Sequence, residues 1–248
     1  MNLLSNKIAL VTGGGTGIGR SIAKQLAQDG ANVFIVGRRE AQLQESAAQH
    51  ENIDFMVADV LDSGDVAKVL AQIEERFGRL DIVVNNAGIA PVTPIENVDL
   101  ADFDRTFNLN VRAVIDVTSQ AIPLLKAGKG CVINITSGLV NNPMPMNSIY
   151  TASKAAVLSL TQTWAKELAP YGIRVNSVAA GATKTPLYDG LGLNAEETKS
   201  YEDAVANIVL LGRFAEPDEI APIVVFLASD KAIYATGGHY AVDGGFGI

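Results

Sequence analysis

The stretch of sequence that decides the fold is Ile8-Ala-Leu-Val-Thr12-Gly-Gly-Gly-Thr-Gly-Ile-Gly19. Its first five residues form an apolar run with the length of a buried strand, and a helical pattern begins at Gly17. The glycines between strand and helix allow a tight turn and let the backbone come close to a pyrophosphate. Unpaired N–H groups at the start of the helix would face that pyrophosphate. A glycine-rich turn without a ligand is the alternative interpretation.

Apolar runs alternate with helical patterns along the remaining chain of 248 residues. Strands buried on both faces are apolar at every position, and strands that alternate with helices form a parallel sheet. We therefore predict a single α/β domain over residues 1–248, doubly wound and Rossmann-type. After the first strand, the expected strands cover residues 32–36, 53–57, 80–84, 131–136, 173–178 and 239–242. The expected helices cover residues 17–29, 66–77, 101–125, 148–169 and 217–228.

Composition excludes several classes of protein. A hydrophobic content of 48% excludes disorder, and the net charge of −8 argues against a nucleic-acid binder. Cys131 is the one cysteine, so no disulfide forms within the chain. With His50 and His239 as the two histidines, we expect no metal site. No secretory signal begins the sequence, and no apolar run approaches the ~20 residues that span a bilayer, so we expect a cytoplasmic protein without a membrane partner.

The end of the second strand indicates which nucleotide binds. Enzymes that bind NAD usually have an acidic residue there, whereas this chain has Gly37 followed by Arg38 and Arg39. Two guanidinium groups can hold a ribose 2′-phosphate. We therefore predict NADP(H) over NAD(H), with a solvated basic pair as the alternative. Thr16 is a departure, because many NADP enzymes of this type carry a second basic residue at that position.

Tyr150 and Lys154 are four residues apart in a predicted helix and share one face. An ammonium close to a phenol lowers the phenol pKa from ~10, and such a phenol can exchange a proton with a carbonyl or alcohol oxygen. Ser137 would hold that oxygen, and the Asn110 amide would hold a water against the lysine. The alternatives are a packing tyrosine beside a lysine stem, a turn serine and a surface asparagine.

Five motifs stand in order along the chain: Thr12-Gly13-x-x-x-Gly17-Ile18-Gly19, Asn85-Asn86-Ala87-Gly88, Asn110, Ser137 and Tyr150-x-x-x-Lys154. Together they resemble the short-chain dehydrogenase/reductase family, over essentially the whole chain. The resemblance implies a seven-stranded parallel sheet and hydride transfer between NAD(P)H and a carbonyl or hydroxyl carbon. It also implies that Tyr150 is the general acid and base, that Lys154 lowers the Tyr150 pKa and binds the nicotinamide ribose, and that Asn110 anchors a proton-relay water.

The motifs and the resemblance together predict a cofactor site. Asp59 would accept a hydrogen bond from the adenine amine, and residues 86–88 would line the ribose of the adenosine. The chain departs from the family at Ala180-Gly181, where Pro-Gly is frequent, and at Thr183, where Ile or Val is common. The predicted cofactor residues are Gly13, Thr16, Gly17, Ile18, Gly19, Arg38, Arg39, Asp59, Val60, Asn86, Ala87, Gly88, Tyr150, Lys154, Gly181, Thr183 and Thr185.

Apolar side chains between Ser137 and Tyr150 suggest a substrate wall, with core packing as the alternative. Residues 184–201 follow a strand at the edge where open α/β sheets bind ligands, so we interpret them as a substrate lid rather than a plain loop. The predicted substrate residues are Leu139, Val140, Met144, Met146, Leu187 and Tyr188.

No Arg or Lys lies between Ser137 and Tyr150, which disfavours a strongly anionic substrate. Acyl-carrier-protein reductases of the family typically have arginines where this chain has Gly128 and Tyr171, with Lys126 and Lys129 nearby. We therefore predict an NADP-dependent oxidoreductase that interconverts a small or medium ketone and a secondary alcohol. A 3-oxoacyl-thioester reductase and a non-catalytic NADP-binding regulator are the alternatives. The resemblance also implies a homotetramer, with helices 101–125 and 148–169 at one interface and residues 241–248 near another.

Overall fold

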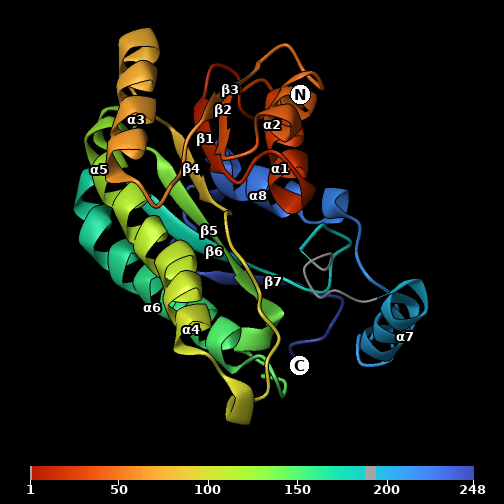
Figure 1. Cartoon of the computed structure of the whole chain (residues 1–248). Helices are drawn as coiled ribbons and strands as arrows, with labels where there is room; N and C mark the ends of the chain where they lie inside the picture. Colours follow the sequence, from red (N-terminus) through yellow and green to blue (C-terminus); the bar gives the residue numbers. More distant parts are fainter. Residues whose placement is uncertain (1, 188–193) are drawn as a thin grey trace.

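Seven parallel strands form the central sheet of the protein, in the order β3-β2-β1-β4-β5-β6-β7 (Figure 1). The computed structural model describes residues 2–187 and 194–248. This sheet confirms the predicted seven-stranded Rossmann-type fold. The strands are β1 (Ile8–Thr12), β2 (Asn32–Gly37), β3 (Ile53–Val57), β4 (Ile82–Asn85), β5 (Cys131–Ser137), β6 (Arg174–Ala180) and β7 (His239–Val242).

Helices cover both faces of the sheet because each strand sends alternate side chains to opposite sides. In β1, Ala9 and Val11 belong to one buried cluster, and Ile8 and Leu10 belong to the other. On the first face lie α1 (Gly17–Gln28), α2 (Glu40–Ala47) and α8 (Ala221–Ala228). On the second face lie α3 (Ser63–Phe77), α5 (Ala113–Gly128) and α6 (Ser148–Leu168).

The helix predicted over residues 101–125 is interrupted. The structure has α4 (Leu100–Phe107), then a π-helical turn over Asn108–Arg112, and then α5. A π-turn adds a residue to the helical repeat without ending the helix, so the apolar pattern does not show it. Asn110 lies within this turn and is 1% exposed.

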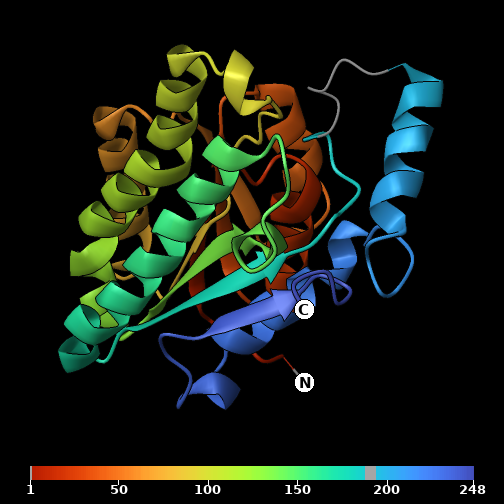
Figure 2. The ribbon, with the colours of Figure 1, turned by 90° about the horizontal axis from the view of Figure 1, so that it is seen from below.

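Two helices fall outside the predicted elements. The sequence analysis assigned no element to α2, in which only Leu43 and Ser46 are buried. In the segment interpreted as a lid, α7 (Ala195–Ala206) is helical, and Figures 1 and 2 show it standing apart from the two helical layers. The segment 184–201 is thus irregular only in part. Residues 188–193, including the predicted substrate residue Tyr188, lie outside the described residues.

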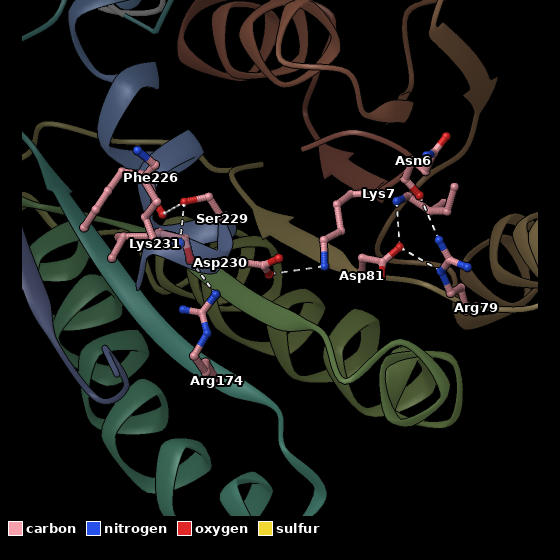
Figure 3. A network of polar contacts seen from close by, with 11 residues as sticks. Asn6, Lys7, Arg79, Asp81, Arg174, Phe226, Ser229, Asp230 and Lys231 are labelled. Atoms are coloured by element: carbon pink, nitrogen blue, oxygen red, sulfur yellow. Dashed lines mark hydrogen bonds and ion pairs between the residues drawn. The ribbon is translucent and has the colours of Figure 1, made fainter. Parts of the chain in front are cut away.

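Charged side chains connect the amino ends of the strands to neighbouring segments through hydrogen bonds (Figure 3). The buried carboxylate of Asp81, just before β4, accepts hydrogen bonds from the Ile8 amide (2.8 Å) and from Arg79 Nε (3.1 Å). Arg174, which begins β6, donates to the Leu227 carbonyl (2.7 Å). Cys131 begins β5 between these groups and is 2% exposed. Asp81, Arg79 and Arg174 therefore have a structural role at this edge, where they connect strands to neighbouring segments.

The opposite edge, at the carboxyl ends of the strands, is where we expect ligands to bind. All strands run parallel, but the order in which they follow along the chain reverses between β1 and β4, because β2 and β3 lie on one side of β1 and β5 to β7 lie beyond β4. Ligands of open α/β sheets bind at this topological switch point. Among the described residues, no helix is long and apolar enough to cross a membrane.

Candidate active site

Ser137, Tyr150 and Lys154 come together at the carboxyl end of β5. Ser137 is the last residue of that strand, and α6 carries the other two one helical turn apart. The Ser137 hydroxyl lies close enough to the Tyr150 phenol to lower the phenol pKa. Lys154 Nζ lies 5.9 Å from the centre of the Tyr150 ring and donates to the Ile135 carbonyl at 2.8 Å. The sequence prediction that these three residues share one site agrees with this geometry.

Burial sets the protonation of the two titratable groups. Burial raises the pKa of Tyr150, and the nearby Ser137 hydroxyl offsets part of that rise. Burial also lowers the pKa of Lys154 to about 8. The Lys154 ammonium is directed to the Ile135 carbonyl and is itself poorly solvated. The expected lowering of the Tyr150 pKa by Lys154 stays a prediction. At neutral pH the phenol carries its proton.

Asn110 is anchored to the loop that follows β4. Its Nδ2 donates to the Ile89 carbonyl (2.9 Å) and to Ser153 Oγ (3.0 Å), and its Oδ1 accepts from the Ile89 amide (3.0 Å). A Cβ added to Gly88 would lie 3.1 Å from Asn110 Oδ1 and 3.5 Å from Lys154 Nζ. Both amide N–H donors of Asn110 are thus used, and one lone pair of Oδ1 is left for the expected water beside Lys154.

The glycine loop is held against the end of β4. Thr12 Oγ1 accepts hydrogen bonds from the Asn86 and Ala87 amides, and Asn86 Nδ2 donates to the carbonyls of Thr12 and Gly13. Gly13 has a φ of +66°, and an added Cβ would lie 3.0 Å from the Ala87 Cα. The structure thus brings the first and second predicted motifs into direct contact.

Gly19 cannot carry a side chain without displacing this loop. An added Cβ would lie 2.4 Å from both the Gly13 carbonyl oxygen and Asn86 Nδ2. We expect Gly19→Ala to lower the free energy of unfolding by roughly 1–3 kcal/mol, the usual cost of overpacking, and to weaken cofactor binding. Urea unfolding monitored by circular dichroism measures the first effect. Gly37→Ala is the control, since its nearest neighbour would be Leu43 Cδ2 at 3.6 Å; equal losses in both variants would contradict the prediction.

Arg20 also holds the glycine loop, and the sequence analysis did not single it out. Its guanidinium donates to the Gly15 carbonyl through Nε (2.9 Å) and Nη2 (2.6 Å), and it forms an ion pair with Glu45 at 3.1 Å. Arg20 thereby connects the loop to α2. Its place directly after Gly19, in the first turn of α1, is the sequence signal that could have identified it.

Arg38 and Arg39 lie exposed between β2 and α2. Within residues 2–187 and 194–248, neither guanidinium makes a hydrogen bond or an ion pair. Thr16, the N-cap residue of α1, makes no side-chain cap. Two unpaired cations beside an uncapped helix start fit the phosphate groups of a dinucleotide.

The remaining predicted cofactor residues surround the same edge of the sheet. Val60 and Ala87 line one small cavity together with Thr12. Asp59 follows β3, and its Oδ1 accepts from the Leu61 amide at 3.0 Å. Thr185 covers the glycine loop, because a Cβ on Gly17 would lie 3.0 Å from Thr185 Cγ2. Ile18 packs partly buried against the core beneath the loop.

The loop after β6 keeps its shape without the family's frequent proline. A Cβ on Gly181 would lie 2.5 Å from the Asp243 Cα, so only glycine fits. The Gly181 amide donates to the Val242 carbonyl, and the buried Thr183 hydroxyl donates to the Gly181 carbonyl at 2.9 Å. Close packing of Gly181 and the Thr183 hydrogen bond therefore constrain this segment.

The predicted substrate residues occupy two segments near Ser137. Leu139 and Val140 form a short 3₁₀ turn directly after it and are half-buried, as is Met144. Met146 is 48% exposed and Leu187 is 39% exposed, so both side chains are largely open to solvent. Among the described residues, no group of three or more His, Cys, Asp or Glu side chains is arranged to hold a metal ion.

Comparison with known proteins places this geometry among oxidoreductases. Residues 13–247 match a family model described as enoyl-(acyl carrier protein) reductase. The chain is 37% identical to a 3-oxoacyl-[acyl-carrier-protein] reductase of Thermotoga maritima, and the match covers 99% of each protein. It is also 37% identical, again over 99% of each protein, to a cyclopentanol dehydrogenase of a Comamonas species. A crystal structure of 3-ketoacyl-(acyl-carrier-protein) reductase from Brucella melitensis complexed with NADH superposes with a TM-score of 0.91 at 34% identity, covering 99% of this chain and 100% of that one.

Proposed function

The chain belongs to the short-chain dehydrogenase/reductase family, and from this premise we propose that it interconverts a ketone and a secondary alcohol with NADP(H). Family membership makes it an oxidoreductase of CH–OH and C=O groups that uses a nicotinamide cofactor. The single observation that carries the proposal is the placement of Ser137 at the carboxyl end of β5 beside Tyr150, with the buried Lys154 one helical turn away. Tyr150 is the general acid in reduction and the general base in oxidation.

Residues at the carboxyl edge of the sheet fit the cofactor. The glycine loop leaves no room for side chains at Gly13 and Gly19, and Lys154 spends one of its three donors on Ile135. The two remaining donors can hold the hydroxyls of the nicotinamide ribose. When bound, the cofactor supplies or accepts the hydride.

Side chains of the protein donate and accept the proton that accompanies hydride transfer. Because burial raises its pKa, Tyr150 keeps its proton at neutral pH and donates it to the ketone oxygen as negative charge develops there. The Ser137 hydroxyl, which lies beside the phenol, holds the same oxygen in place. Lys154 and a water on Asn110 Oδ1 then return a proton to Tyr150 from solvent. In oxidation the phenolate accepts the proton of the alcohol.

Arg38 supports the choice of NADP(H), since its guanidinium is exposed and has no partner among the described residues. We expect Arg38→Ala to weaken NADPH binding by roughly 10- to 100-fold, which corresponds to one lost charge-assisted hydrogen bond. NADH binding should change by less than about twofold, because NADH lacks the 2′-phosphate. Fluorescence titration with each nucleotide measures both constants. Arg76→Ala, a change at an arginine on the far side of the sheet, is the control, and equal losses for both nucleotides in Arg38→Ala would refute the role.

The test of the proposed reaction is a substrate panel, followed by cofactor absorbance. NADPH and NADH are each offered with aryl ketones, aliphatic ketones, a diketone and an acetoacetyl thioester. Turnover of ketones with NADPH supports the proposal. Turnover of none of these ketones, with the nucleotide still bound, contradicts it.

A 3-oxoacyl-thioester reductase is the second candidate, and one surface feature favours it. Lys126 Nζ lies 3.5 Å from the centre of the Tyr171 ring, so a lysine occupies the region where carrier-protein reductases of the family have arginines. An acyl carrier protein is acidic and would meet a positive charge there. Turnover of the acetoacetyl thioester alone would select this candidate over the ketone reductase.

Apolar residues on the surface support the expected homotetramer. Leu100, Phe103 and Ile115 are exposed on α4 and α5, which lie at one predicted interface. Ile233 and Tyr234 are exposed shortly before β7, near the other. Light scattering after gel filtration measures the assembly, and a mass of about 26 kDa would contradict it.

A further inference from the structure

Residues Asp243–Gly247, which follow β7, form a turn that contacts three segments around the active site; we refer to it as the 243–247 turn. On one side it packs on Gly138, whose added Cβ would lie 3.1 Å from Asp243 Oδ2 and 3.2 Å from the Phe246 ring. On a second side it packs on Gly181. On a third side, the Gly244 carbonyl accepts from the Leu211 amide at 3.1 Å. No role of this turn follows from the predicted motifs.

The Asp243 carboxylate holds the turn in shape. Its Oδ1 accepts from the Gly245 amide and its Oδ2 accepts from the Gly247 amide, each at 3.0 Å. Gly244 and Gly245 have φ angles of +64° and +82°, a conformation that glycine adopts without strain. Phe246 is 7% exposed and fills the space beneath Gly138. The turn is therefore rigid, and its contact with Gly138 is close.

A single side chain ties the turn to the segment after Ser137. Asn142 Nδ2 donates to the Phe246 carbonyl at 2.9 Å, although the residue is otherwise exposed. Within that segment, the amides of Asn141 and Asn142 both donate to the Gly138 carbonyl, and the Leu139 amide donates to Ser137 Oγ at 3.2 Å. Displacement of the turn would move Gly138 and, through the Leu139 amide, the Ser137 hydroxyl.

We propose that the 243–247 turn positions Ser137 and the substrate wall of Leu139 and Val140, with Asp243 and Asn142 as its positioning residues. This inference rests on the proposed function for its effect on turnover. The contact between the 243–247 turn and the segment after Ser137 does not depend on which substrate is bound. The turn also contacts the segment after α7, so it connects both walls between which a substrate would lie.

The first test is kinetic. Asn142→Ala removes the connecting donor, and Asp243→Asn replaces the oxygen that accepts from Gly247 with an N–H group. A misplacement of about 1 Å costs up to ~10²-fold in rate, so we expect kcat/KM for the ketone to fall by about 10- to 100-fold in both variants. In Asn142→Ala the dissociation constant for NADPH should stay within about twofold, because the glycine loop is untouched. Asp243 also packs on the predicted cofactor residue Gly181, so NADPH binding is compared in Asn142→Ala alone. Relative rates on bulky and small ketones should also change, because Leu139 and Val140 move.

Asn147→Ala is the matched control. Asn147 lies in the same segment and its Nδ2 also donates to a carbonyl, but that carbonyl is Pro145, two residues away, rather than the 243–247 turn. The control should retain wild-type kcat/KM and wild-type ratios between ketones. Loss of activity in the control equal to that in Asn142→Ala would overturn the specific role of the turn.

The second test is hydrogen exchange on the protein without substrate, which separates this inference from the proposed function. In Asn142→Ala and Asp243→Asn, amides in a peptide over residues 137–143 should exchange about tenfold faster, while a peptide over residues 63–77 in α3 should not change. Unchanged exchange in residues 137–143 would overturn the inference. Absence of ketone turnover in the unaltered protein would instead overturn the proposed function, and exchange would still report the connection.

Discussion

Replacing Tyr150 with phenylalanine is expected to lower ketone reduction by roughly 10³-fold, within the usual contribution of a general acid. The ring remains and keeps its packing, and only the hydroxyl that meets Ser137 is lost. NADPH affinity should stay within about twofold, because the predicted contact of α6 with the nicotinamide ribose comes from Lys154. Stopped-flow measurement of hydride transfer and fluorescence titration of NADPH give the two quantities separately.

Tyr234→Phe is the matched control for this prediction. Tyr234 is fully exposed and lies on the loop before β7, so loss of its hydroxyl should change neither quantity. Turnover in Tyr150→Phe within tenfold of the unaltered protein would remove the phenol from the mechanism. A variant that lost NADPH binding together with turnover would assign Tyr150 to cofactor binding instead.

Replacing Lys154 with methionine should lower turnover and stabilise the fold. Lys154 is 6% exposed, and burial lowers its pKa from 10.5 to about 8. At about 1.4 kcal/mol for each pKa unit, keeping this group charged costs the folded state about 3 kcal/mol. Loss of the hydrogen bond with the Ile135 carbonyl offsets about 1 kcal/mol, which leaves a net gain of about 2 kcal/mol at pH 7.

The gain in Lys154→Met has a pH signature. Between pH 8 and 10.5 the unfolded chain binds a proton at Lys154 that the folded protein has released, so the stability of the unaltered protein rises with pH across that window. The cost of the buried ammonium is therefore fully present below pH 8 and is gone by about pH 10.5. The advantage of the methionine variant should decrease over the same range. Urea unfolding at pH 7, 9 and 10.5 measures it.

Turnover in Lys154→Met should fall by roughly 10²-fold, because the proton relay and the predicted contacts with the ribose are lost. Lys166→Met is the control: this lysine is exposed on the same helix, and its removal should leave activity and the pH profile of stability unchanged. A methionine variant less stable than the unaltered protein at pH 7 would show that the lysine stabilises the fold despite its burial.

The sheet could be predicted from the sequence because its strands are unusually uniform. Every residue of β1, β4 and β5 is buried, so each strand contains a run of at least three apolar residues that the sequence shows directly. The glycine loop and the pair Tyr150 and Lys154 were predictable for a related reason. Each is a local pattern, in which spacing along one turn or one helix already sets which groups face each other.

The features that were missed depend on contacts between distant segments. Helix α2 has only two buried residues in eight, so it lacks the apolar stripe that predicts a helix. The spacing of Tyr150 and Lys154 shows a phenol beside a lysine, but it does not show that desolvation raises the phenol pKa or that the Ile135 carbonyl accepts from the ammonium. The 243–247 turn reaches Gly138 across more than a hundred residues of chain, a contact that no local pattern contains.

Cys131 gives the molecule an internal reporter of its own unfolding. Burial raises the pKa of its thiol to about 11, so the folded protein presents almost no thiolate, which is the form that reacts with alkylating reagents. The residue is the first of β5, where it pairs with Ile82 of β4 and Arg174 of β6, so we expect local fraying of loops or of α7 to leave it covered. Because it is the one cysteine in the chain, each molecule gains a single mass increment when the sheet opens. The rate at which a thiol reagent alkylates Cys131, followed by intact mass, would therefore report how often the core opens. A bound nucleotide that stabilises the fold should lower that rate.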